Sequence, residues 1–317
     1  MKAMVCTKYG PPEVLQLREV EKPVHMDYDV LIKIHATAVT SSDCYVRGMD
    51  LSMLYRFAAR IALGFSRPRQ PILGMVFAGE VEAIGRNVSL FKTGDRVFGI
   101  DCFAFGAYGE YKAMPEAGVI AHMPLDATYE EAAALPYGGV LALSFLRGKI
   151  HSGQRVLVYG ASGAVGTAAV QLAKCFGAHV TGVCGSSNLE LLKTLGADDV
   201  IDYRREDPAA RGETYDLVFD AVGKRKSKSF QYRRVLAPGG NFISVDNGKP
   251  KLRPEDLVLL KELAEQGQVR PVIDRCYPIE EMAEAHRYVD KGHKKGNIVV
   301  TMSITRKGVS ESSEWQF

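Results

Sequence analysis

A run of eleven residues near the middle of the chain, VLVYGASGAVG, constrains the fold more than any other segment. It covers residues 156–166 and places Gly160, Gly163 and Gly166 three residues apart, where an apolar strand gives way to a helix. From Ala164 onward small apolar residues recur at helical spacing, and a second apolar run, HVTGVC, follows over residues 179–184. The segment therefore predicts one strand–helix–strand unit of a parallel sheet.

The glycine-containing turn is typical of a dinucleotide site. Glycines permit a tight turn and close packing of the helix on the strand, and the free N–H groups at the start of the helix attract phosphate. Three glycines in a chain that contains 31 can also mark a simple turn, but the order strand, helix, strand favours the dinucleotide. The cofactor contacts predicted from this turn are Gly160, Ala161, Ser162, Gly163, Ala164, Val165 and Gly166.

The residues after the second strand indicate which dinucleotide is bound. NAD-binding units usually place Asp or Glu there to hold the ribose 2′-OH, whereas this chain continues with CGSSN and offers no carboxylate that would repel a 2′-phosphate. Lys193, Arg204 and Arg205 could add positive charge, although a solvated surface position fits Lys193 and Arg205 better. We therefore expect NADP(H) rather than NAD(H). The predicted contacts on this side are Ser186, Ser187, Asn188 and Tyr203.

Composition and charge describe a soluble globular protein with room for two domains. Of 317 residues, 46% are hydrophobic and 24% charged, and 40 basic and 37 acidic residues leave a net charge of +3 without long runs of one sign. This balance gives no support to nucleic-acid binding. No stretch approaches the roughly 18 apolar residues of a membrane-spanning helix, and the start MKAMVCTKYG shows no targeting pattern. We expect a cytoplasmic protein that acts on a small molecule and has no transmembrane segment.

The six cysteines are dispersed along the chain, with no two closer than nine residues. Neither a CxxC zinc spacing nor a compact disulfide framework is present. Reduced, structurally ordinary thiols are expected.

The texture of the sequence divides the chain into two domains. Residues 1–125 contain short β-branched runs punctuated by Gly and Pro, as in an all-β module. From Thr128 onward helices and strands alternate, which predicts a doubly wound parallel sheet. The tail from Asp274 holds a short helix and a strand that fit better as a return to the β-rich module. We expect one domain over residues 1–125 and 270–317 and the other over residues 126–269.

A series of segments in order along the chain carries a family resemblance. They read VLIKIHATAVTSSDCYVRG, PILGMVFAGEVEAIGRNVSLFKTGDRVFG, GAYGEYKAMPE, EEAAALPYGGVLAL, VLVYGASGAVGTAAVQLAKCFGAHVTGVC, LGADDVIDY, YDLVFDAVG and LAPGG. In these segments the chain resembles the medium-chain dehydrogenase/reductase superfamily, in its zinc-free quinone oxidoreductase and enone reductase branch. The resemblance implies an α/β fold with a GroES-like β-rich catalytic domain formed by the two chain ends. Between them it implies a Rossmann doubly wound parallel sheet, with the active site in the cleft.

Positions that hold zinc in the alcohol dehydrogenases of this superfamily are filled differently here. Thr40 stands in place of the catalytic Cys, Met75 and Val76 replace a His-Glu pair, and only Cys102 remains where a four-cysteine zinc lobe is expected. None of the first three is a good zinc ligand. The comparison implies a site without metal, in which the cofactor supplies the hydride and the protein positions a quinone or a conjugated carbonyl.

The resemblance also implies the residues of the active site. Quinone reductases place an Asn at the Thr40 position and a Tyr at the Tyr45 position, and only the Tyr is kept here. Tyr45 and Thr40 are expected to be catalytic, Thr40 by donating a hydrogen bond and Tyr45 by stacking on the substrate or donating to its carbonyl. Tyr45 could instead fill the wall of the cleft. Asp43 is expected to be a helix cap or an ion-pair partner. Further cofactor contacts implied by the resemblance are Tyr137, Gly138, Ala221, Val222 and Gly223, with Tyr137 and Gly138 alternatively forming a turn for close packing.

Two departures from generic quinone reductases are expected to matter. Residues 49–70 form an apolar and basic insertion that could be a lid or cleft wall, a surface for a membrane or partner, or a plainly packed helix. After Val245 only a short segment precedes the next helix, whereas the family usually has a few dozen residues containing the strand that joins two Rossmann sheets. We expect a monomer or a non-standard homodimer.

Three functions compete at this point. The leading one is an NADPH-dependent, zinc-independent reductase of quinones or α,β-unsaturated carbonyls that acts by hydride transfer. The second is a zinc-independent alcohol or aldehyde oxidoreductase with Tyr45 or Thr40 as proton relay. The third is an NADPH-binding sensor or partner-binding protein with little catalysis, which the loss of the Asn at Thr40 supports.

Overall fold

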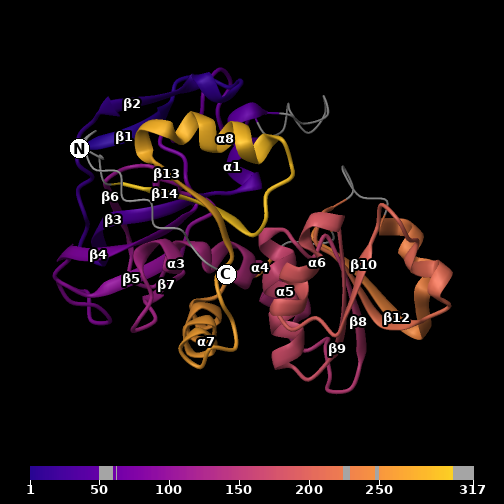
Figure 1. Cartoon of the computed structure of the whole chain (residues 1–317). Helices are drawn as coiled ribbons and strands as arrows, with labels where there is room; N and C mark the ends of the chain where they lie inside the picture. Colours follow the sequence, from indigo (N-terminus) through magenta and orange to yellow (C-terminus); the bar gives the residue numbers. More distant parts are fainter. Residues whose placement is uncertain (50–59, 62, 224–228, 247–249, 303–317) are drawn as a thin grey trace.

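Two domains of different build make up the computed structural model, which describes residues 1–49, 60–61, 63–223, 229–246 and 250–302 (Figure 1). The first domain is rich in antiparallel β-structure and takes segments from both sides of the second. Its strands are β1 (Lys2–Cys6), β2 (Leu15–Glu19), β3 (Asp29–Val39), β4 (Val76–Ile84), β5 (Arg96–Ile100), β6 (Tyr111–Pro115), β7 (Ile120–His122), β13 (Ile273–Pro278) and β14 (Asn297–Thr301). Its helical segments are η1 (Pro12–Val14), α1 (Ser41–Gly48), α3 (Tyr129–Ala134), η5 (Ile279–Glu281) and α8 (Met282–Asp290).

The larger sheet of this β-rich domain joins distant parts of the chain. Its strand order is β13-β14-β3-β4-β5-β7, and β6 also pairs with β3. β14 runs antiparallel to β3, with Ile298 opposite Val39. β3 is rich in β-branched residues, which favour a strand, and most of its side chains are buried. The segment that follows the second domain in the sequence therefore completes the sheet of the first.

The second domain is built on a parallel sheet of five strands in the order β10-β9-β8-β11-β12. The strands are β8 (Arg155–Tyr159), β9 (His179–Cys184), β10 (Asp199–Asp202), β11 (Tyr215–Asp220) and β12 (Leu236–Ser244). The helical segments are α4 (Pro136–Leu146), α5 (Ala164–Cys175), η2 (Ser186–Asn188), α6 (Leu189–Thr194), η3 (Pro208–Arg211), η4 (Ser229–Val235) and α7 (Pro254–Glu265). The chain starts in the middle of the sheet at β8 and then builds outward in both directions, which makes it doubly wound.

The two faces of the parallel sheet are covered in different ways. Val156 and Val158 of β8 pack in a large apolar cluster with α4 and α5. Leu157 points to the other face, where Tyr232 and Val235 of η4 cover it. The expected fold class, a doubly wound parallel sheet with a β-rich second domain, is confirmed.

One apolar cluster continues from the first domain into the second. It runs from Phe98 in β5 through Ala133 of α3 and Val140 of α4 to Val156 of β8. α3 follows the boundary expected near residue 126, yet it packs against β3 and β4. In Figure 1, α4 and α5 lie between the two sheets. The junction of the domains is therefore made of packed side chains, which give a site located there a rigid frame.

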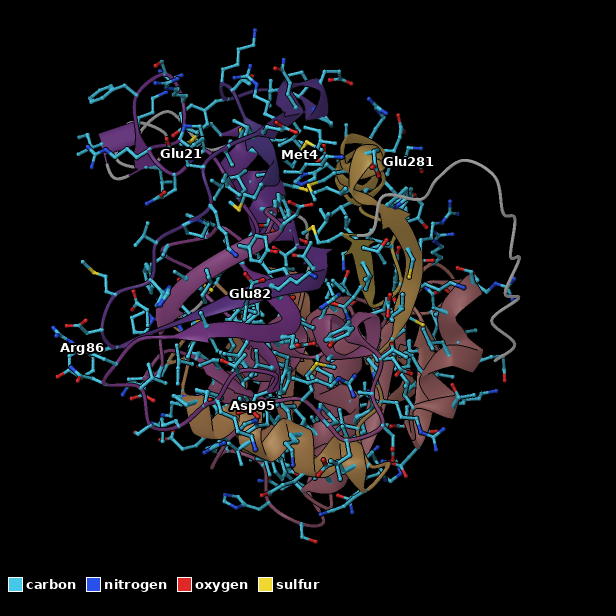
Figure 2. The ribbon with its side chains drawn as sticks, turned by 90° about the vertical axis from the view of Figure 1, so that its left-hand side faces the viewer. Met4, Glu21, Glu82, Arg86, Asp95 and Glu281 are labelled. Atoms are coloured by element: carbon cyan, nitrogen blue, oxygen red, sulfur yellow. The ribbon has the colours of Figure 1, made fainter. Side chains whose placement is uncertain are left out.

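The face of the β-rich domain turned toward the viewer in Figure 2 carries charged side chains, among them Glu82, Arg86 and Asp95. Glu82 pairs with Lys22, and Arg86 pairs with Asp27. Such solvent-exposed pairs contribute only about 0–1 kcal/mol each. They therefore add little to the stability of the domain.

Three expectations from the sequence concern the insertion over residues 49–70, the edge of the parallel sheet and membrane-spanning helices. The insertion over residues 49–70 lies for the most part outside the described residues, because 50–59 and 62 are not among them. In the part of the chain that is described, the parallel sheet ends at β12, and the oligomeric state stays a prediction. No helix within the described ranges is long and apolar enough to cross a membrane.

Candidate active site

The turn of residues 160–166, here named the phosphate turn, gives each of its glycines a different task. Gly160 has a φ of 74°, and a Cβ at this residue would lie 2.3 Å from Cγ2 of Val222. A Cβ at Gly166 would lie 2.2 Å from the carbonyl oxygen of Gly160, so this glycine lets α5 pack on the turn. At Gly163, with a φ of −80°, a Cβ would meet only the Gly160 oxygen, at 3.6 Å. The turn is therefore closed by protein at two glycines and open at the middle one.

The open side of the phosphate turn is the start of α5. Gly163 is the N-cap of this helix and no side chain caps it, so the first N–H groups of α5 are available to an anion. A second turn lies beside it, because the N–H of Ala221 donates to the carbonyl oxygen of Tyr159 at 3.0 Å. Oδ1 of Asp220 accepts the N–H groups of Val222 and Gly223 and so shapes this second turn. The two turns therefore lie side by side at the carboxyl ends of β8 and β11.

A carboxylate lies where the sequence predicted none. Ser186 of η2 donates its hydroxyl proton to Oδ2 of Asp202, which ends β10 and lies opposite Cys184 of β9. The hydrogen bond from Ser186 is the main cause that lowers the pKa of Asp202, so this residue carries a negative charge. The expectation that this corner lacks a carboxylate is wrong, because parallel pairing of β10 with β9 brings in a residue 16 positions along the chain.

Arg204 offsets this charge at the same corner. A Cβ on Gly185 would lie 3.5 Å from Nε of Arg204, so the guanidinium lies over the backbone that leads into η2. Arg205 is directed to Asp202 at 3.6 Å with 81% of its side chain exposed, and Lys193 pairs with Glu190 at 2.9 Å. Of these three cations, Arg204 is the one that forms no ion pair with a residue in the described ranges.

The remaining residues predicted at this corner differ in exposure. Ser187 is exposed and Asn188 is half-buried in η2. Tyr203 is 47% exposed, and the centroid of its ring lies 6.4 Å from that of Tyr159. Together with Arg204 they surround the carboxyl ends of β9 and β10.

Thr40 and Asp43 form a reciprocal cap at the start of α1. The Thr40 hydroxyl accepts the N–H of Asp43 at 3.1 Å and donates to Oδ2 of Asp43 at 2.6 Å. The N–H of Thr40 also donates to that carboxylate. Asp43 is thus the cap that the sequence led us to expect. Thr40 is buried and its hydroxyl proton is bound by Asp43, so it has a structural task in the cap, and its expected contact with the substrate stays a prediction.

Buried polar contacts fix the underside of α1 to α8. Sγ of Cys44 lies 3.3 Å from Nδ1 of His286, and Nε2 of His286 lies 3.1 Å from the hydroxyl of Tyr108. Burial lowers the pKa of His286 well below its usual value, so the ring is neutral. Arg47 pairs with Asp290 of α8 at 2.7 Å. These contacts hold the helix that carries Ser42 and Tyr45.

A pair of hydroxyl groups joins the two domains at this helix. Oγ of Ser42 lies 2.9 Å from the hydroxyl oxygen of Tyr137 at the start of α4. Burial raises the pKa of Tyr137 to about 12. Tyr45 is half-buried and lies three residues after Ser42, so the two residues share a face of α1.

Gly138 follows Tyr137 and has a packing task. A Cβ at Gly138 would lie 2.2 Å from the carbonyl oxygen of Ala164. Gly138 therefore allows α4 to pack closely on α5, which is the alternative that the sequence left open. The predicted contact of Gly138 with the cofactor stays a prediction. The short distance also places Tyr137 next to the phosphate turn.

Sequence reasoning missed a contribution from the loop before β14. The N–H of Gly296 donates to the carbonyl oxygen of Ser162 at 2.8 Å, and Gly296 forms an isolated parallel bridge with Gly163. Lys294 binds the carbonyl oxygen of Gly296, and burial lowers its pKa to about 8. In the sequence this segment is visible only as the basic run Lys294-Lys295-Gly296. Its contact with the phosphate turn follows from the packing of the two domains.

Comparison with known proteins agrees with this geometry. A family model described as an alcohol dehydrogenase GroES-like domain matches residues 26–144, and one described as a zinc-binding dehydrogenase matches residues 164–287. Human quinone oxidoreductase is 30% identical over 92% of this chain and 94% of the relative. The chain belongs to the medium-chain dehydrogenase/reductase family. It is accordingly an oxidoreductase of that family.

Other members of the family are similar over most of their length. A 2-methylene-furan-3-one reductase of Solanum lycopersicum is 33% identical over 95% of this chain and 79% of its own. The human protein named "NAD(P)H oxidoreductase RTN4IP1, mitochondrial" is 29% identical over 95% of this chain and 89% of its own. The solved quinone oxidoreductase of Coxiella burnetii has a TM-score of 0.84 at 28% identity and covers 96% of this chain and 99% of its own. Because one of these relatives is named as mitochondrial, the cytoplasmic location stays a prediction.

The name of the second family model includes zinc, and the residues of this chain do not fit that ion. The Thr40 hydroxyl is bound to Asp43. Met75 and Val76 are buried and offer no thiolate, imidazole or carboxylate. Across the described ranges, no group of three or more His, Cys, Asp or Glu side chains could hold a metal ion.

Proposed function

We propose that the protein is an NADPH-dependent, zinc-independent reductase of quinones or α,β-unsaturated carbonyls. One observation carries the proposal: the phosphate turn is open only at Gly163, beside the uncapped start of α5. The names of the quinone oxidoreductase and furanone reductase relatives support the substrate class. The lack of zinc donors at Thr40, Met75 and Val76 supports a reaction without that metal.

The choice of NADPH over NADH rests on the corner formed by η2 and the end of β10. Arg204 lies over Gly185 and is free of ion pairs to described residues, so its guanidinium can bind a 2′-phosphate in a fork. Asp202 is charged, but Ser186 already donates to it. Arg204 and Arg205 together exceed its single charge. We therefore place the 2′-phosphate between Arg204 and Ser187, the serine of η2 that is exposed.

Binding and orientation are the tasks of this chain in the proposed reaction. When bound, the cofactor supplies a hydride at the nicotinamide ring. The N–H groups at the start of α5 bind the pyrophosphate, and Lys294 adds a positive charge close to the same turn. Tyr45 on α1 contacts the substrate, and the packed junction of the two domains holds α1 and the phosphate turn in a fixed arrangement.

A second candidate function is an NADPH-binding protein with little catalysis. It is favoured by one observation, since the Thr40 hydroxyl has no proton left to donate to a substrate. The decisive measurement is turnover of purified protein with a panel of quinones, enones and simple alcohols, with NADPH and NADH in parallel. Reduction of enones or quinones with NADPH supports the reductase. Tight NADPH binding without consumption supports the binding protein, and oxidation of simple alcohols with NADP⁺ supports an alcohol oxidoreductase.

A further inference from the structure

The hydroxyl groups of Ser42 and Tyr137 form a contact that the capping and packing of the site do not require. Their oxygens are 2.9 Å apart, and each side chain comes from a different domain. Both are half-buried, and neither makes another hydrogen bond within the described ranges. Two hydroxyl groups carry two protons, and the bond between them uses one. The pair therefore keeps one proton that can be donated.

The pair lies close to the phosphate turn, beside which the proposed reaction requires the substrate carbonyl to bind. Ser42 is in the first turn of α1, one residue before the capping Asp43. Tyr137 precedes Gly138, whose backbone is pressed against the carbonyl oxygen of Ala164 beside the open Gly163. The two helix starts that carry the hydroxyls thus converge next to the phosphate turn.

Other donors near this point are already in use. The Thr40 hydroxyl donates to Asp43. The Tyr108 hydroxyl is buried against His286, behind α1. Of the hydroxyl groups of Thr40, Tyr108, Ser42 and Tyr137, only the pair Ser42 and Tyr137 keeps a proton that is not used in a hydrogen bond within the described ranges. We propose that Ser42 and Tyr137 together form the donor to the substrate carbonyl oxygen, an inference that rests on the proposed reductase function.

The proton and electron balance of this step is simple for a conjugated enone. The hydride brings two electrons to the β-carbon, the carbon–carbon π pair moves toward the carbonyl, and negative charge collects on the carbonyl oxygen. Tyr137 donates its proton to that oxygen while Ser42 donates to the phenolate that is left, and water returns a proton to the pair. The enol then takes a proton from water at the α-carbon and releases the one on oxygen, which leaves the saturated ketone.

Burial of Tyr137 suits this task. Its raised pKa keeps the phenol protonated at neutral pH, so the donor is present when the hydride arrives. A bound oxyanion replaces water as the acceptor in a site of low dielectric, where such hydrogen bonds are strong.

The test compares Tyr137→Phe, Ser42→Ala and the double variant with the parent. We expect kcat/KM for an enone to fall about tenfold to hundredfold in Tyr137→Phe, with a smaller fall in Ser42→Ala. The double variant should be no worse than Tyr137→Phe, because the two groups act as one donor. Calorimetry gives the NADPH affinity of each variant, so that a loss of cofactor binding is separated from a loss of turnover. Tyr215→Phe, which removes a hydroxyl bound to Glu213 at the other end of β11, is the matched control.

A probe that needs no turnover separates this inference from the proposed function. We would titrate 4-nitrophenol spectroscopically in the presence of protein and NADP⁺. The parent and Tyr215→Phe should lower the apparent pKa of the probe, because the pair donates to its oxyanion, and Tyr137→Phe should abolish the shift. If the parent reduces no acceptor, the proposed function fails and the probe alone decides the inference. The inference is overturned if Tyr137→Phe keeps the parent kcat/KM within twofold, or if the parent does not shift the probe.

Discussion

The Thr40 hydroxyl donates to Oδ2 of Asp43 at 2.6 Å and accepts the N–H of Asp43 at 3.1 Å, so this side chain is fully engaged at the start of α1. In the quinone reductases that the sequence resembles, an Asn stands at this position. In this chain Thr40 and Asp43 form a capping box that stabilises the start of the helix.

Thr40→Ala should therefore act on stability more than on chemistry. Loss of an N-cap side chain costs about 1 kcal/mol, whereas Thr40→Ser keeps the hydroxyl and should match the parent. Urea unfolding measures the first quantity, and kcat/KM should stay within about threefold in both variants. A hundredfold loss of turnover in Thr40→Ala at unchanged stability would show that Thr40 takes part in catalysis.

Asp43 should make stability depend on pH. Burial raises the pKa of this carboxyl to about 6, above the roughly 3.9 of an unfolded chain. The folded state then holds the proton more tightly, so its contribution is fully present below about pH 4 and is lost as the pH rises through 6.

The measurement is the difference in unfolding free energy between the parent and Asp43→Asn at several pH values from 4 to 8. This difference should change by on the order of 2–3 kcal/mol across that window, with the parent losing stability relative to the variant as the pH rises. A constant difference would show that the carboxyl titrates alike in the folded and unfolded chain.

Gly163→Val and Gly160→Ala should fail in different ways. A Cβ at Gly163 meets protein only at 3.6 Å, so the apo-protein should still fold and lose no more than about 1 kcal/mol at this N-cap, but the side chain takes the space of the pyrophosphate. NADPH affinity should fall at least about tenfold, or 1.4 kcal/mol. Gly160→Ala, at a φ of 74° and 2.3 Å from Val222, should lose about 1–3 kcal/mol of stability. Normal NADPH binding by a folded Gly163→Val variant would contradict the assignment of the dinucleotide site to the phosphate turn.

Arg204→Ala should weaken NADPH and spare NADH. We expect the Kd of NADPH to rise about tenfold and that of NADH to change less than twofold, because only NADPH carries the 2′-phosphate. Lys193→Ala is the matched control, since Lys193 is paired with Glu190 on the surface of α6. Thermal-shift and calorimetric titrations give both constants. If the affinities for NADPH and NADH fell equally, Arg204 would not be the residue that binds the 2′-phosphate.

Removal of metal should leave activity unchanged. The residues at the position of the family's catalytic zinc are Thr40, Met75 and Val76, which offer no suitable ligand. Protein purified without added metal should contain less than one equivalent of zinc by elemental analysis and should keep its turnover in a chelator. Turnover that depends on stoichiometric zinc would contradict this expectation.

The phosphate turn and the fold class could be predicted because their signals are local. Three glycines at fixed spacing, an apolar strand and a helix with small residues are all read from residues 156–175. The cap at Asp43 is equally local, since Thr40 and Asp43 are three residues apart.

The parts of the site that were missed depend on contacts between distant segments. Asp202 reaches Ser186 only because β10 pairs with β9. Tyr137 meets Ser42 across 95 residues, and Gly296 reaches Ser162 from the other domain. No pattern within one segment carries this information, because each contact is set by how two elements pack.

The bridge between Gly296 and the phosphate turn has a mechanical consequence. Because the N–H of Gly296 is bound to the carbonyl oxygen of Ser162, rotating one domain away from the other must break a bond in the turn itself. A backbone hydrogen bond of this kind is worth about 0.5–1.5 kcal/mol, small enough to open thermally and large enough to bias a hinge. If the cofactor binds at this turn, we expect its binding and the angle between the two domains to influence each other through this hydrogen bond.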